Sequence, residues 1–369
     1  MFVVQLIQRA RFQCRGLVAW IFVGIIAYGF ACQVPVFRFA LERWEADSYT
    51  LVIVPGSQGE LSADEEAVAA FLQSRGSADG PAPNVNVAID AETVGEGTRA
   101  SMALSYPLNG VGADAPPIWH GPLIMENARG LVDSPARREI VARLLKGESA
   151  VWVMVESGDE EKDEAAATEI EKAFLKAESE LKIPDGVLTV EEAPESPDGD
   201  SDDVLRSSIP LKIDFSFIRI SRDDPAEAIF REMLLHMEDD LEDFMNEPMV
   251  FPVFGRGRAL EPLIGRGINS KNVFEHASYF CGACSCEIKN QNPGVDLLIA
   301  ANWEAAIAGS EVAVEKSLPP LMGIGALNDG EGTSADGETG NSFLSLWLIA
   351  GIGMVLVLGS ILILRKEAR

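Results

Sequence analysis

The sequence predicts an α/β protein with two α/β units in tandem, exported from the cytoplasm and anchored by a C-terminal transmembrane helix. Three observations lead to this fold class. Apolar runs rich in β-branched residues alternate with amphipathic helical patterns, the order of these elements repeats along the chain, and a long uncharged apolar segment lies near the C-terminus. At 369 residues, the chain is long enough for two domains that each bury a core.

The first unit is predicted over 35–148. An apolar run that closes on Pro-Gly indicates a buried strand over 48–56. Ser62 and Glu65 form a capping box that begins a helix, and Gly76 ends it. Three more strands and a second helix follow: strands over 84–89, 101–106 and 117–124, and a helix that begins at Ser134 and Pro135.

The second unit is predicted over 149–310 and includes a cysteine-rich extension at its C-terminal end. It begins with a strand over 149–157 and an amphipathic helix over 158–182. After an acidic linker over 190–204, the remaining elements are a strand over 210–221, a helix over 224–244, a hairpin of 248–254 with 259–265, and a helix over 270–280. The order of strands and helices thus repeats that of the first unit, which indicates an internal repeat.

The order strand, helix, strand, helix, hairpin, helix resembles that of a thioredoxin-like domain, over about 149–281 and more weakly over 48–147. The segment "EPMVFPVFGRGRALEPLIGRG" is similar to the part of thioredoxins where a proline opens the third strand and a glycine-containing turn leads to the fourth. The resemblance implies a mixed sheet with flanking helices in each half, and Pro248 as the cis-proline of that family. The chain also resembles uncharacterised bacterial envelope proteins that carry "CSC" near the end of the second half.

The chain departs from the thioredoxin pattern where that family carries its C-x-x-C motif. There the helix amino terminus lowers the pKa of the thiol at the junction of the first strand and first helix. The corresponding junctions read "VPGSQG" and "VESGDEE" and contain no cysteine. Neither half is therefore expected to perform thioredoxin chemistry at the usual place.

The C-terminal end predicts the membrane anchor. Residues 343–364 contain no charge, and at about 1.5 Å per residue they span roughly 33 Å as a helix, enough to cross a bilayer. Arg365, Lys366 and Arg369 follow, so the positive-inside rule places the tail 365–369 in the cytoplasm. The glycine-rich and acidic stretch 311–342 is predicted to be a flexible linker.

The N-terminal residues 1–34 predict a signal sequence or an anchor helix. Three arginines precede 17 uncharged residues that end at Cys32. A cleaved secretory signal, a lipoprotein signal acylated at Cys32 and a retained anchor helix all fit this pattern. Each places the bulk of the chain on the outer side of a bacterial cytoplasmic membrane, in the periplasm or cell envelope. The ends are basic, and without them the rest of the chain carries a net charge of −32, which fits an exported middle.

The total net charge of −27 argues against nucleic acid as a partner, because binding to phosphates requires a basic surface. The membrane and another envelope protein are the partners that we expect. "GRGRALEPLIGRG" carries Arg256, Arg258 and Arg266, which are either solvated turn residues or ligands of an anion. His236 stands alone in the sequence, and the carboxylates of "HMEDDLEDF" are interpreted as a solvated surface.

The segment "YFCGACSCEIK" contains the strongest candidate for chemistry, with Cys281, Cys284 and Cys286 in six positions. A disulfide between Cys281 and Cys284 that Cys286 attacks would be redox-active. Three thiolates with His276 would suit zinc or cuprous copper. A structural disulfide or a buried thiol cluster is the third interpretation.

These observations favour a membrane-anchored extracytoplasmic binding or assembly protein over an enzyme, and they predict no cofactor. The alternative is a thiol redox or soft-metal-handling protein that acts through Cys281, Cys284 and Cys286, with zinc or copper as its metal.

Overall fold

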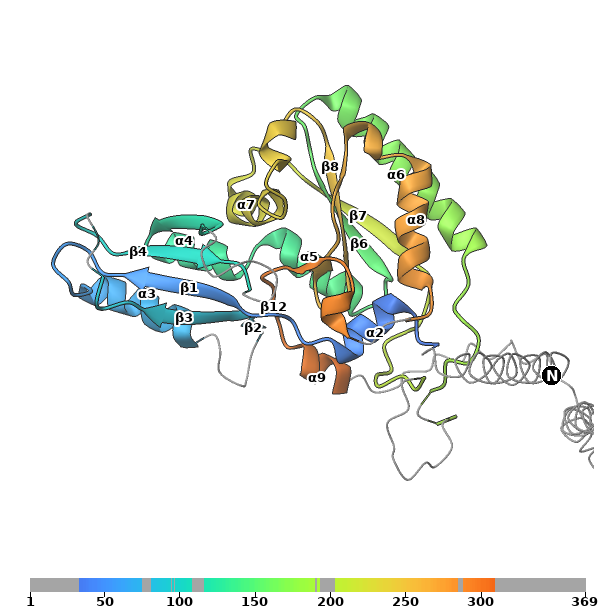
Figure 1. The fold of residues 1–369 in the computed structure, drawn as a ribbon, viewed down its shortest axis with the longest axis horizontal. Coiled ribbons are helices and arrows are strands. Elements are labelled where there is room, and N and C mark those ends of the chain that lie inside the picture. Colours follow the sequence, from blue (N-terminus) through green and yellow to red (C-terminus); the bar gives the residue numbers. More distant parts are fainter. Residues whose placement is uncertain are drawn as a thin grey trace, which may run out of the picture. The chain divides into compact units, whose positions relative to one another are not determined.

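The computed structural model describes residues 33–74, 81–93, 95, 97–107, 116–189, 191–192, 203–284 and 288–308. All of them belong to one compact unit of the chain, 1–314. The described residues form two mixed sheets with flanking helices and a short two-stranded antiparallel sheet, which confirms the predicted α/β class (Figure 1).

The predicted membrane segments lie outside these residues. Both 343–364 and the N-terminal stretch through Cys32 belong to the part of the chain that the structure does not describe, as do 311–342 and 365–369. Within the described ranges, no helix is both long enough and apolar enough to cross a membrane.

The first sheet has the strand order β3-β1-β4-β5. Its strands are β1 (Tyr49–Val54), β3 (Val85–Ile89), β4 (Ser101–Ser105) and β5 (Trp119–Pro122). Strand β3 runs parallel to β1, whereas β4 runs antiparallel to both β1 and β5. The helix α3 (Ala63–Ser74) connects the two parallel strands, as such a crossover requires.

The capping box predicted at α3 is confirmed. The backbone amide of Ser62 donates to the Glu65 carboxylate at 2.8 Å, and the Glu65 amide donates to the Ser62 hydroxyl at 3.4 Å. The same carboxylate accepts from the backbone amide of Ala100 at 2.8 Å, so it also ties the helix to the start of β4. These amide hydrogen bonds, that of Ser62 foremost, lower the pKa of Glu65.

The second sheet has the order β11-β9-β8-β6-β7, and β10 also pairs with β8. Its strands are β6 (Ala150–Val155), β7 (Phe215–Ile220), β8 (Met249–Phe254), β9 (Arg258–Ala259), β10 (Leu263–Ile264) and β11 (Val295–Asp296). Strand β7 is parallel to β6, and β8 is antiparallel to β6 and to its hairpin partners β9 and β10. When the strands of each sheet are numbered along the chain, the first four lie in the same spatial order in both sheets: second, first, third, fourth.

Helices connect or follow these strands at the predicted places. The helix α6 (Glu160–Glu180) lies between β6 and β7, and α8 (Ser270–Cys281) follows the hairpin. The 3-10 turn η1 (Pro225–Glu227) and α7 (Ala228–Leu235) replace the longer helix predicted over 224–244. The prediction was wrong beyond Leu235, because the chain turns there before η2 (Leu241–Phe244).

The remaining elements complete the unit. They are α2 (Val36–Arg43), β2 (Ala82–Pro83), α4 (Met125–Val132), α5 (Pro135–Leu144), η3 (Gly265–Gly267), η4 (Lys289–Gln291), β12 (Ala300–Ala301) and α9 (Trp303–Ala308). The C-terminal strand β12 pairs with β2 of the first half, and α2 contacts β8 and α8 of the second. Each half is therefore completed by residues from the other end of the described chain.

Both central strands of the second sheet are buried over their full length. Because successive side chains point to opposite faces, Val151, Val153 and Val155 join one core cluster while Trp152 and Met154 join another. The first cluster also contains the buried residues of the first sheet, such as Leu51. One core is thus shared by both sheets.

Candidate functional site

Residues 279–284 of the cysteine segment form the C-terminal end of α8 and the chain that follows it. They are hydrogen-bonded to the residues at the start of α2. Cys281 is the last residue of α8, and both Cys281 and Cys284 are almost fully buried, with 3% and 1% of their surface exposed. The backbone amide of Val36 donates to the Gly282 carbonyl, and that of Cys284 donates to the Val34 carbonyl, each at 3.0 Å. These two hydrogen bonds therefore hold the start of α2 next to the C-terminal end of α8.

The environment of Cys281 is unfavourable for redox chemistry. Its thiol is not in a disulfide, and burial raises its pKa to about 12, against the opposing effect of a hydrogen bond with Ser149. The carboxyl end of a helix also disfavours a thiolate. Cys286 lies outside the described residues, so the structure does not test a reaction in which it attacks a Cys281–Cys284 disulfide.

His276 is not arranged as a metal ligand of these cysteines. Its Nδ1 lies 3.0 Å from the Asn272 carbonyl oxygen, and its ring meets Trp152 edge to face at a centroid distance of 5.8 Å. Among the described residues, the ligand atoms of His276, Cys281 and Cys284 do not gather closely enough to share a cation. The three described members of the predicted S₃N site therefore do not assemble around one cation.

Two of the three arginines that were predicted to bind an anion donate their hydrogen bonds to other residues of the protein. Arg256 donates to the carbonyl oxygens of Leu41 and Glu42 and to the Glu304 carboxylate. Arg258 donates to two carbonyl oxygens and to Asp296, at 3.0 Å from its carboxylate.

Arg256 and Arg258 are both buried, whereas Arg266 is exposed on η3. The prediction of an anion site was wrong for the first two, because their guanidinium groups fix the hairpin turn to the rest of the core.

Pro248 does not have the predicted cis geometry. The peptide bonds of the described residues are all trans, including the one that precedes Pro248. Its carbonyl oxygen accepts a hydrogen bond from the Gly265 amide at 2.8 Å, immediately before β8 begins. The proline thus opens the strand, as expected, but in the ordinary trans form.

Two carboxylates accept hydrogen bonds from the backbone amides at the amino-terminal end of α6. Asp159 caps the helix and accepts from the amides of Glu161 and Lys162 at 3.1 and 3.4 Å. The buried Asp163 accepts from the amides of Ser157 and Gly158 at 2.7 and 3.1 Å. The amides at this junction of strand and helix therefore already hold two negative groups.

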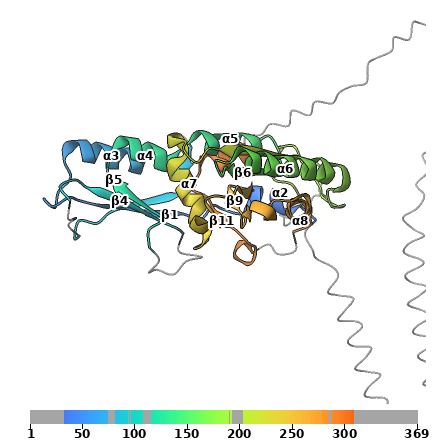
Figure 2. The same cartoon turned by 90° about the horizontal axis from the view of Figure 1, so that it is seen from above.

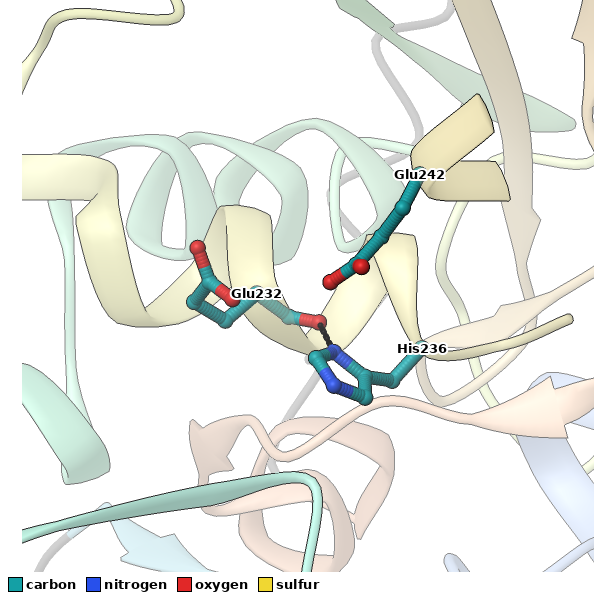
Figure 3. A group of neighbouring side chains, drawn as sticks. All are labelled: Glu232, His236 and Glu242. Atoms are coloured by element: carbon teal, nitrogen blue, oxygen red, sulfur yellow. Dashed lines mark hydrogen bonds between the residues drawn. The ribbon is translucent and has the colours of Figure 1, made fainter. Parts of the chain in front are cut away.

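One group of side chains that could bind a metal ion was not predicted from the sequence. Glu232 on α7, His236 directly after it and Glu242 on η2 each offer a ligand atom, and these atoms lie within 4.8 Å of one another (Figure 3). The spacing of four residues between Glu232 and His236 is a helical signal that was present in the sequence. Glu242 gave no such signal, because only the unpredicted turn after Leu235 brings it to the histidine.

Comparison with known proteins adds no relative. No protein-family model, no curated protein and no solved structure matches the chain.

Proposed function

We propose that the protein is a membrane-anchored binding or assembly module of the bacterial cell envelope, built from two thioredoxin-like halves that perform no thiol chemistry. The strand order and directions of both sheets support the thioredoxin-like comparison. The second half has the full order β6, α6, β7, α7, β8, hairpin and α8. The first half has no described helix between β3 and β4.

The observation that carries this proposal is that carboxylates, and no cysteine, lie at the amino terminus of α6. A catalytic thioredoxin-like site needs a thiolate there, stabilised by free amides and the helix dipole. In this chain, Ser157, Gly158 and Asp159 occupy the junction, and the carboxylates of Asp159 and Asp163 take up its amides. A thiolate at this place would be a third negative group, so it would be repelled and would lack donors. The alternative function through Cys281 has less support, because that thiol is buried and has a raised pKa.

The first sheet offers the surface on which a partner would bind. Helices α3 and α4 lie on the same side of this sheet (Figure 2). Leu51 and Met102 are buried in one core cluster with residues of these two helices, so they belong to that side. The other side, here called the open face, carries a row across all four strands: Ala88, Val52, Ala103 and His120. These side chains are partly or fully exposed. Figure 2 shows no described helix on this side of the first sheet. Small and β-branched side chains on a sheet provide a flat surface for protein contact.

Membrane anchoring and export are part of the same proposal. The amide of Gln33, the first described residue, donates to the Asp203 carboxylate at 2.6 Å, so the chain is already held by the described unit at the residue that follows Cys32. An anchor there and the predicted span over 343–364 would hold both ends of the unit at the membrane.

A photo-crosslinking residue at Ala103 tests the binding function in cells that make the full-length chain. We expect a discrete adduct with one envelope protein. The matched control carries the same residue at Glu171, which is exposed on α6, and should give no such adduct. Adding Val52→Arg to the Ala103 variant places a charge on the open face without entering the core, and it should abolish the adduct. The same adducts from both positions, or none from Ala103, would contradict the proposed surface.

A further inference from the structure

The group of Glu232, His236 and Glu242 brings together side chains from two elements on either side of a chain turn. Glu232 and His236 are half-buried, and Glu242 is exposed. Figure 3 shows the Glu242 carboxylate extending from η2 toward the imidazole ring of His236. One nitrogen and two carboxylate oxygens can thus approach a common point.

A hydrogen bond to a backbone carbonyl determines the tautomer of the His236 imidazole. The Nδ1 atom of His236 lies 2.8 Å from the carbonyl oxygen of Glu232 (Figure 3). Because a carbonyl oxygen only accepts, Nδ1 carries the proton and donates it, which leaves the lone pair of the neutral ring on Nε2. Histidines that bind metals commonly have this arrangement, in which the second nitrogen is held by a carbonyl group.

The surroundings hold an excess of negative charge. The turn between His236 and Glu242 carries three more acidic residues, Glu238, Asp239 and Asp240. Arg231 lies next to the group: its guanidinium is 3.9 Å from the Glu232 carboxylate and also donates to the Arg222 carbonyl. Among the described residues of 231–243, the acidic side chains outnumber the basic ones, so a divalent cation would be attracted here.

We propose that Glu232, His236 and Glu242 form a binding site for a divalent transition-metal ion, with zinc as the best-matched cation. A mixed set of one imidazole and two carboxylates suits zinc, whereas magnesium and calcium prefer oxygen ligands alone and cuprous copper prefers thiolates. Three protein ligands leave a fourth position for water or for an oxygen of a bound partner. The ion would join α7 to η2 across the turn. This site is separate from the cysteine segment and independent of the proposed binding surface.

Zinc titration of the purified full-length chain against a chromophoric chelator tests the site. All five cysteines, Cys14, Cys32, Cys281, Cys284 and Cys286, are replaced by serine in this chain, so that thiolates do not contribute. We expect one equivalent of zinc, with the affinity reduced at least about tenfold in Glu242→Gln and in His236→Asn. Asparagine keeps a donor near the position of Nδ1 but lacks Nε2, so it separates ligation from the local hydrogen bond. Thermal unfolding without zinc checks that each variant is folded.

Asp240→Asn is the matched control, because it removes a charge from the same turn without removing a ligand. It should weaken binding much less than Glu242→Gln. An equal loss in both variants would show diffuse attraction to acidic residues and would overturn the proposal, as would the absence of a saturable equivalent. A cobalt spectrum of the wild-type chain gives a further check, since a thiolate charge-transfer band that vanishes in the serine variant would assign the metal to the cysteines instead.

Discussion

Replacing Glu42 by alanine is expected to lower the free energy of unfolding by about 3–5 kcal/mol. Glu42 and Arg38 form an ion pair on α2 at 2.9 Å, and neither side chain is exposed. The Glu42 carboxylate also accepts from the amides of Arg206 and Ser207, at 2.8 and 3.0 Å. Its removal would leave a buried guanidinium without a counter-charge and two amides without acceptors, which is far more costly than losing a surface pair.

Urea unfolding of the purified chain, followed by tryptophan fluorescence, measures this loss as a shift of the midpoint. The control is Asp133→Ala, which breaks the exposed pair with Arg138 and should cost at most about 1 kcal/mol. Glu42→Gln keeps the shape and one acceptor oxygen, so its loss should lie between the two. Equal midpoints for Glu42→Ala and Asp133→Ala would refute the buried network.

Phe251→Ala is expected to cost about 3–5 kcal/mol, because it opens a cavity in the core that both sheets share. Phe251 is fully buried on β8 and lies in the same cluster as Leu51 and Met102 of the first sheet. The loss should therefore appear in both halves, as one shifted transition. Phe244→Ala is the matched control, since 41% of Phe244 is exposed and its truncation should cost a small part of that amount.

Separate probes in the two halves distinguish one folding unit from two. Trp119 lies on β5 in the first sheet, whereas Trp152 lies on β6 in the second. With each as the sole reporter, Phe251→Ala should shift both unfolding curves together. A shift confined to the Trp152 curve would mean that the halves unfold independently.

Much of the fold was predictable because local patterns agree with it. The capping box at Ser62, the apolar strand at 150–155 and the hairpin after Pro248 are all encoded by neighbouring residues. Helix α2 was not predicted, because its sequence includes the charged Arg38 and Glu42, which become buried only through contacts with residues more than 160 positions away. Pairings such as that of β12 with β2 leave no local signal at all.

The candidate sites depended even more on tertiary structure. Three cysteines in six positions suggested chemistry, but the burial of Cys281 could not be read from their spacing. Arg256 and Arg258 suggested an exposed basic turn, and the fold instead uses them as internal donors. Conversely, His236 seemed isolated until the turn after α7 brought Glu242 beside it. Side chains that act through distant parts of the chain are the ones that sequence patterns describe least well.

The rate at which Cys281 reacts with a disulfide reagent, in the reduced and natively folded full-length chain, tests most directly the claim that this protein works without thiol chemistry. Burial raises the pKa of Cys281 to about 12, so its thiolate is scarce at pH 7, and burial also restricts the access of a reagent. Modification identified by peptide mapping should therefore occur only as fast as the chain unfolds, and rapidly in denaturant. Fast modification of Cys281 in the folded chain at pH 7 would contradict the account and favour a redox function.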